Sequence, residues 1–167
     1  MMQDPEYAAL HNDVSDLLRR AEKVAESALI RTEEALAELL ENAVRLPDGR
    51  AVFIDRNGNV RTEDGKIIDP VIAESLVFPE NAPSYESYRA HRERVEGIRR
   101  YQVETLGHAR ERLEDQDNPP SKNELKDLQR DIETGLDTTI QRQTGADETP
   151  ENTYNPSSNV DVPKLDG

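Results

Sequence analysis

The first part of the chain repeats apolar residues in alternating steps of three and four, the spacing of a helical face that packs as in a coiled coil. Asp4 and Pro5 are typical of a helix start, and neither Gly nor Pro recurs until Pro47. We therefore predict a helix from about Pro5 to about Arg45, with a wider apolar face after residue 28 that should be the best-packed part of the molecule. The apolar stripe before that point consists of Tyr7, Leu10, Val14, Leu17, Ala21, Val24 and Ala28.

Two later segments carry helical patterns of their own. The stretch from Ser84 to Leu113 has the same spacing with more polar residues, and we expect it to form the second helix. Ser121 and Glu124 have the spacing of a capping box, which begins a third helix. The apolar stripe of this third helix is Leu125, Leu128, Ile132, Leu136 and Ile140. The chain is thus predicted to be mainly α: an antiparallel coiled-coil-like helical hairpin plus a third helix.

A small β meander, over about residues 47–69, is predicted between the first and second helices. Ala51–Ile54 and Val60–Thr62 read as strands, and Asn57-Gly58 between them is a strong signal for a two-residue hairpin turn. Ile67–Ile68 is the expected third strand. Asp69 and Pro70 then repeat the cap-plus-proline start of a short helix.

The periodic pattern ends near residue 142. We predict a helical hairpin domain with the inserted meander over residues 1–142, followed by a flexible acidic and polar tail over 143–167, where Thr, Asn, Pro, Ser and Asp dominate. Within this tail, spaced apolar residues are typical of a docking peptide, although a purely solubilising tail explains the same composition. These residues are Tyr154, Val160, Val162 and Leu165.

Composition agrees with an elongated helical protein. Hydrophobic residues are 34% of the chain, aromatic residues are 4% and Trp is absent, so each helix is expected to bury only one stripe. Without Cys, disulfides and cysteine-based zinc sites are excluded. No apolar run is long enough to span a bilayer and the first residues are acidic, so we expect no membrane partner and a cytoplasmic location.

The net charge of −14 argues against direct nucleic-acid binding, because carboxylates repel phosphates. Residues 84–113 are the exception, with five acids and seven bases. Internal pairing with acidic neighbours is the favoured explanation for this basic stretch. The alternative is a binding face for an acidic partner or a nucleic-acid backbone, for which the candidate residues are Arg92, Arg99, Arg100 and Tyr101.

No residue pattern indicates a catalytic site, a cofactor or a metal. Asp55, Asn57 and Asn59 have the spacing of the first ligands of a calcium loop, but Val60 and Lys66 stand where that loop needs Gly and an acid. The three histidines lack metal-binding spacing, and nucleophile motifs and phosphate-binding glycine loops are missing. The chain is therefore predicted not to be an enzyme.

These features favour a non-enzymatic adaptor, or an inhibitor or chaperone-like protein, that binds another protein through helix faces, the tail or both. A basic partner suits the acidic chain, and salt should then weaken binding. Two alternatives remain: a self-assembling structural component of a bacterial or phage particle, with a second copy of the chain as the partner, and an acidic mimic of DNA.

Overall fold

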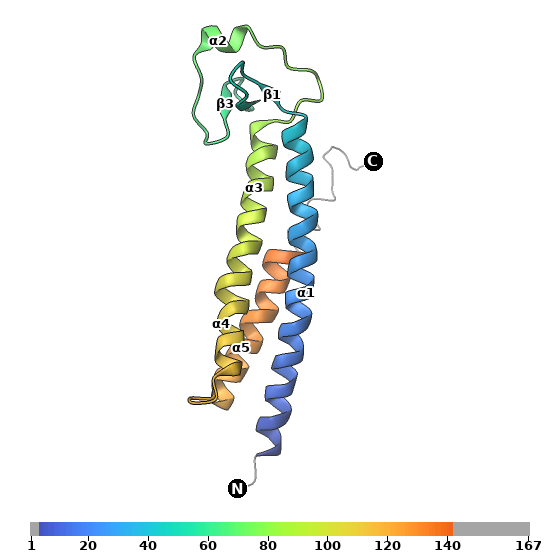
Figure 1. Ribbon diagram of the computed structural model, residues 1–167, viewed down its shortest axis with the longest axis vertical. Helices are drawn as coiled ribbons and strands as arrows, with labels where there is room; N and C mark the ends of the chain where they lie inside the picture. The colour runs from blue at the N-terminus through green and yellow to red at the C-terminus, as the bar shows by residue number, and fades with distance from the viewer. Residues whose placement is uncertain (1–3, 142–167) are drawn as a thin grey trace, which may run out of the picture. The chain divides into compact units, whose positions relative to one another are not determined.

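The computed structural model describes residues 4–141, and this part of the chain is mainly helical with a small three-stranded antiparallel sheet (Figure 1). These two features confirm the predicted fold class at that level. The chain divides into two compact units, which are described separately below. Unit 1 comprises Met1–Ala28 and Gly97–Gly167, and unit 2 comprises Leu29–Glu96.

Helix α1 runs over Pro5–Glu41 and contributes residues to both units. Its start is as predicted, since the Asp4 carboxylate accepts a hydrogen bond from the Glu6 backbone N–H at 3.0 Å. Its predicted end at Arg45 is wrong, because Val44–Arg45 forms strand β1. The Arg45 guanidinium donates to the carbonyls of Leu40 and Gly49, both at 2.9 Å, and so connects the end of α1 to the turn that follows β1.

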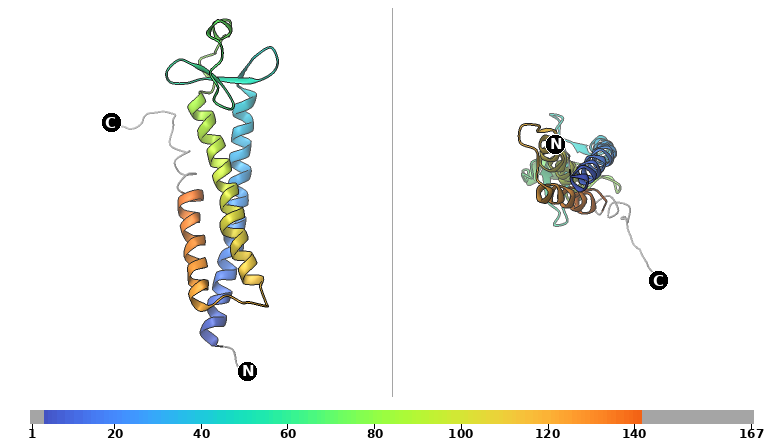
Figure 2. Two further views of the ribbon diagram at one scale, coloured as in Figure 1. Left: turned by 90° about the vertical axis from the view of Figure 1, so that its left-hand side faces the viewer. Right: turned by 90° about the horizontal axis from the view of Figure 1, so that it is seen from below.

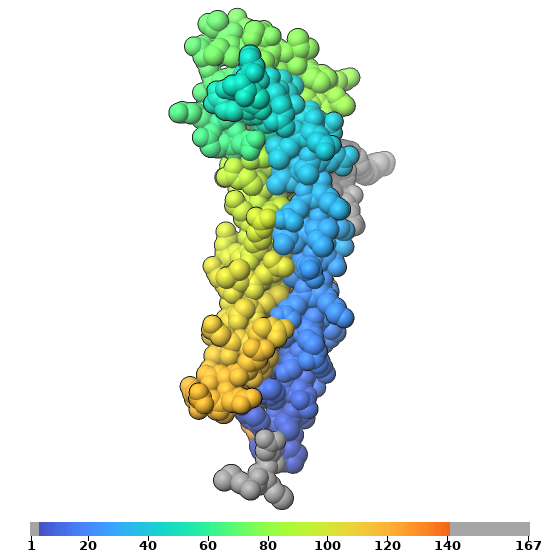
Figure 3. Space-filling model, in the orientation of Figure 1, coloured from blue at the N-terminus to red at the C-terminus, as the bar shows by residue number. Residues whose placement is uncertain are grey.

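Unit 1 packs the first part of α1 beside α4 (Gly107–Glu114) and α5 (Lys122–Gly135) (Figures 1 and 2). Two π-helical segments extend these helices: η1 (Tyr101–Leu106) precedes α4 and η2 (Leu136–Gln141) follows α5. Ser121 caps α5 as predicted, because its hydroxyl accepts from the Glu124 N–H at 3.1 Å. On the face shown in Figure 3, side chains of α4 lie against those of the first part of α1. The largest fully buried side chains of this unit are Val14, Ile98, Leu106, Leu125 and Ile132.

The buried face of α1 differs in part from the predicted stripe. Val24 is 40% exposed and Ala25 is buried instead, so the buried row still alternates steps of three and four but turns slightly around the helix. The expectation of best packing after residue 28 is also wrong, since Ile30 is 49% exposed and most of the fully buried α1 residues precede Leu29. Small side chains at this face permit the close helix packing: Ala21, Ala25 and Ala28.

The sheet of unit 2 has the order β1-β2-β3, with β2 at Ala51–Ile54 and β3 at Val60–Thr62. The predicted hairpin of β2 and β3 forms, and Gly58 adopts a φ of +86° in its turn. The turn is longer than the predicted two residues, because the Asp55 N–H donates to the Asn59 carbonyl at 2.8 Å and the Gly58 N–H to the Asp55 carbonyl at 3.0 Å. The predicted third strand is wrong: Ile67 makes only an isolated bridge to Arg61, and the third strand is β1.

Strand β2 separates two apolar clusters. One face places Val52 with Leu46 and Val60, and the other places Ala51 and Phe53 with Tyr88. The Phe53 and Tyr88 rings stack, with centroids 4.5 Å apart. Helix residues complete the second cluster: Leu36, Leu39 and Leu40 of α1 and Tyr85 of α3 (Tyr85–Arg100).

The predicted second helix is interrupted in its hydrogen-bond pattern, because α3, η1 and α4 follow one another over residues 85–114. The short helix α2 (Pro70–Glu74) is as predicted, with Asp69 accepting from the Val71 N–H at 2.9 Å. Within residues 4–141, no helix combines the length and the apolar character needed to cross a membrane.

Candidate functional site

The residues proposed from the basic stretch lie in different environments. Arg92, in unit 2, donates to the carbonyl of Glu63 at 2.8 Å and to the Tyr88 hydroxyl at 3.3 Å, and lies 3.5 Å from the Glu96 carboxylate. These contacts agree with internal pairing of this arginine. Its guanidinium also lies over the Tyr88 ring, 5.8 Å from the centroid.

The other three belong to unit 1. Arg99 and Arg100 are exposed, whereas Tyr101 is only 4% exposed and its hydroxyl donates to the carbonyl of Ile132 at 2.8 Å. Burial also raises the pKa of Tyr101, so its hydroxyl stays protonated. The structure therefore places Tyr101 in the core of unit 1. The four proposed tail residues, Tyr154, Val160, Val162 and Leu165, lie outside the described residues.

The residues after β2 that have the spacing of calcium ligands form hydrogen bonds within the hairpin. One Asp55 carboxylate oxygen accepts from the N–H groups of Asn57 and Asn59, both at 2.9 Å, and the other accepts from Arg61 Nε at 2.7 Å. The Arg61 hydrogen bond, together with those amides, lowers the pKa of Asp55 below its ordinary value of 3.8. Between residues 4 and 141, no cluster of three acidic or histidine side chains could hold a metal ion.

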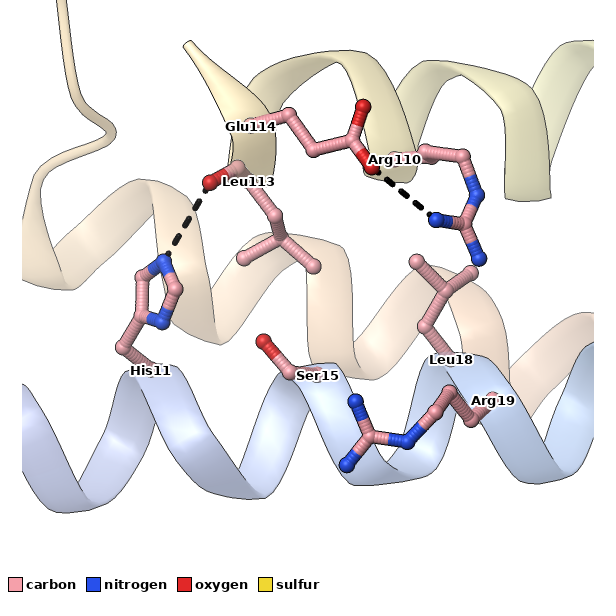
Figure 4. A pocket seen from close by; sticks show the side chains of 7 residues that line it. All are labelled: His11, Ser15, Leu18, Arg19, Arg110, Leu113 and Glu114. Carbon is pink, nitrogen blue, oxygen red and sulfur yellow. Dashed lines mark hydrogen bonds and ion pairs between the residues drawn. The ribbon is translucent and has the colours of Figure 1, made fainter. Parts of the chain in front are cut away.

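A small pocket in unit 1, of about 240 Å³, brings His11 and Ser15 of α1 close to Arg110 of α4 (Figure 4). Arg110 pairs with Glu22 and with Glu114, and a ring nitrogen of His11 lies 3.4 Å from the carbonyl oxygen of Leu113. The polar groups of this pocket thus connect α1 to α4, and we assign them a structural role.

Unit 2 carries the strongest candidate for a functional surface. We use the name α2 surface for the exposed apolar side chains of Ile67, Val71, Ile72 and Val77. Their exposed fractions are 50%, 75%, 47% and 83%, and they are four of the seven large apolar side chains that are exposed in the described chain. Such side chains gathered on one segment are typical of an interaction site.

The segment that carries the α2 surface is anchored from its other side. Ile68, Ala73, Leu76 and Phe78 pack against the cluster of Leu46, Val52 and Val60, and Figure 1 shows α2 beside the sheet. The Ile68 N–H also donates to the Val60 carbonyl at 3.0 Å. The exposed side chains therefore project from a backbone that is held in place, which lowers the entropic cost of binding.

A groove of about 420 Å³ begins at Phe78, the residue after Val77. Ile54, Pro79, Ala82 and Pro83 supply much of its lining, with Arg56, Glu80 and Glu86 among its polar residues. Arg56 and Glu86 pair with each other: the Arg56 N–H donates to the Glu86 carboxylate at 3.0 Å, and the guanidinium lies 3.7 Å from it. A mainly apolar groove of this volume suits an aliphatic or aromatic side chain of a partner.

The charges along the segment that carries the α2 surface are mostly negative, although the exposed Lys66 directly precedes it. From Ile67 to Tyr88 the chain has no Lys or Arg, but it has four acids. Asp69 caps α2 and Glu86 pairs with Arg56, whereas Glu74 and Glu80 are exposed and have no hydrogen-bonding or ionic partner among residues 4–141. This surface was not predicted from the sequence, although its apolar residues, followed by a stretch of four acids without a cation, were a visible signal.

In comparison with known proteins, no protein-family model, no curated protein and no solved structure matches the chain.

Proposed function

We propose that this protein is a non-enzymatic adaptor or inhibitor that binds another protein through the α2 surface. The observation that carries the proposal is the exposure of Ile67, Val71, Ile72 and Val77 on an anchored segment beside an apolar groove. Burying Val71 and Val77 against a partner would remove apolar area from water, which is the main favourable term in most protein associations. The remainder of unit 2 supports this role by holding the segment in place.

Affinity capture with full-length variants tests the proposal. The test variant is V71S/V77S, and the matched control is V103S, because Val103 of unit 1 is also 73% exposed. We expect a specific bound protein to be retained by the native chain and by V103S and to be lost with V71S/V77S. Equal retention by all three variants would contradict the proposal. Loss only when Tyr154, Val160, Val162 and Leu165 are replaced by Ser would assign docking to the tail instead.

A second copy of the chain is the alternative occupant of the α2 surface. Light scattering at several concentrations separates the two cases. A mass that rises with concentration for the native chain but not for V71S/V77S would favour self-assembly over the adaptor function.

We also propose that, within unit 1, α1 and α4 pack as an antiparallel coiled coil. Two contacts support the antiparallel direction: His11 lies near Leu113, and Glu22, further along α1, pairs with Arg110, which comes earlier in α4. The buried α1 row, with its steps of three and four, supports the coiled-coil-like packing. This packing would give the adaptor a stiff helical part.

A further inference from the structure

We propose that the α2 surface binds a cationic amphipathic segment of its partner, in which Lys or Arg residues flank an aliphatic or aromatic anchor. This inference rests on the proposed docking function and adds the chemistry of the partner. It follows from three features of unit 2: the sign of the charges, the unpaired carboxylates and the shape of the groove.

The sign of the charges selects a cationic partner. The stretch from Ile67 to Tyr88 carries only acids, so its local field attracts Lys and Arg and repels phosphates and carboxylates. Lys66, directly before Ile67, is exposed and leaves the segment of residues 66–88 with a net charge of −3, from four acids and one base. Two further neighbouring cations are already engaged. Arg56 pairs with Glu86, and Arg61 pairs with Asp55 and also donates to the Gly65 carbonyl at 2.7 Å.

The unpaired carboxylates provide the contact points. Several carboxylates of unit 2 have arginine partners on the same chain, as in Asp48 with Arg50 at 2.8 Å and Glu93 with Arg89 at 2.8 Å, whereas those of the α1 residues 34 and 38 have none among residues 4–141. Glu74 and Glu80 lack such partners in the described part of the chain. They lie in sequence on either side of Val77, the most exposed side chain of the α2 surface. Cations of a partner can therefore pair with them while an apolar neighbour covers Val77.

The groove provides the site for the anchor. Phe78, Pro79 and Pro83 offer apolar contacts, and two of them are proline rings that lose little entropy on binding. Glu80 also lines this groove, so an apolar anchor in it has a carboxylate close by. Charge complementarity at the edge and an apolar contact in the centre together favour an amphipathic segment over a purely cationic one.

Three synthetic helical peptides of equal length serve as probes in a fluorescence anisotropy titration of the full-length protein. The first contains Leu and Lys, the second Leu and Glu, and the third Ser and Lys. We expect the Leu/Lys peptide to bind at least tenfold more tightly than either of the others. Its affinity should fall as salt rises, because salt screens exposed charges over about 8 Å at physiological ionic strength.

Matched variants separate a specific site from attraction to the acidic chain as a whole. E74Q/E80Q should weaken Leu/Lys binding about fivefold, the effect of losing two exposed ion pairs. E34Q/E38Q removes the same charge from exposed positions of α1 in unit 2 and should change the affinity less than twofold. An equal loss in both pairs of variants would overturn the inference.

The outcomes also separate this inference from the proposed function. If the Leu/Glu peptide binds as tightly as Leu/Lys and V71S/V77S abolishes both, the α2 surface is a docking site but the inferred charge selectivity is wrong. If V71S/V77S leaves Leu/Lys binding unchanged, the peptide is held by general charge attraction, and both the inference and the docking role of the α2 surface fail.

Discussion

Gly135 stands where the buried Tyr101 ring packs closely against α5, and its replacement by Ala gives a sharp test of the structure. A Cβ atom at residue 135 would lie 2.0 Å from Tyr101 Cε1 and 2.5 Å from Cδ1. Ordinary carbon contacts lie at about 3.5 Å or more, so the ring would have to move by about 1.5 Å. Such a movement would disturb the 2.8 Å hydrogen bond from the Tyr101 hydroxyl to the Ile132 carbonyl.

Three effects set the size of the change in the free energy of unfolding. Overpacking of a core costs about 1–3 kcal/mol. A buried hydroxyl that loses its partner costs about 1–3 kcal/mol more. The higher helix propensity of Ala relative to Gly offsets about 1 kcal/mol of this loss of stability. We therefore expect Gly135→Ala to destabilise the protein by about 1–5 kcal/mol, depending on how far the ring can relax.

Urea denaturation followed by circular dichroism measures this change, with Gly97→Ala as the matched control. Gly97 lies in α3 and a Cβ there would meet nothing within 4 Å, so only the helix-propensity gain of about 1 kcal/mol remains. The two substitutions should thus shift the midpoint in opposite directions. A Gly135→Ala protein as stable as the native chain would refute the close packing of Tyr101 against Gly135.

Two further predictions concern the hairpin of unit 2 and the packing of α1. The pKa of Asp55 is lowered in the folded state, so its negative charge stabilises the fold at pH values above its ordinary pKa of 3.8. This stabilisation is lost as the pH falls through the lowered pKa. Asp55→Asn should lower the thermal unfolding midpoint at pH 7, and the midpoint of this variant should decrease less than that of the native chain when the pH is taken below about 4. The control is Asp127→Asn, because Asp127 lies in an exposed pair with Arg130; this variant should have nearly the same midpoint as the native chain at both pH values. For α1, hydrogen exchange should be slow in the backbone amides from Val14 to Ala28, the part with most of its buried residues, and rapid exchange there would contradict the proposed coiled-coil packing.

Local signals in the sequence identified most helix starts and the β2–β3 hairpin. Asp4, Asp69 and Ser121 each accept a hydrogen bond from an N–H in the first turn of the following helix, which is a property of short-range geometry. Gly58 has the positive φ that its turn requires. These features depend on neighbouring residues alone, so the pattern was sufficient to predict them.

Features that depend on distant residues were not predictable in the same way. Strand β1 forms because Val44 and Arg45 pair with Val52 and Ala51, although an uninterrupted helical pattern runs through them. The close contact at Gly135 depends on the Tyr101 ring, which comes from a distant part of the sequence. A single sequence does not reveal which partner a residue meets across the core.

The candidate site depends partly on neighbouring residues and partly on distant ones. The apolar residues of the α2 surface and the lack of cations around them are visible in the sequence, but the pattern does not say which side chains of residues 67–78 face the core. Ile68, Leu76 and Phe78 pack inward whereas Val71 and Val77 are exposed, and that division follows from contacts with β2 and β3. Of the residues proposed instead, Arg92 already has polar partners and Tyr101 is buried, which composition alone did not indicate.

The division of the chain has a consequence for how it folds. Unit 1 is made from two stretches that are separated along the chain by all of unit 2. Its core must therefore form over a long loop, and the entropy lost in closing that loop falls if the intervening residues have already become compact. We expect the hairpin of β2 and β3 and its apolar clusters to acquire structure early during refolding. The packing of α1 against α4 and α5 in unit 1 should form last.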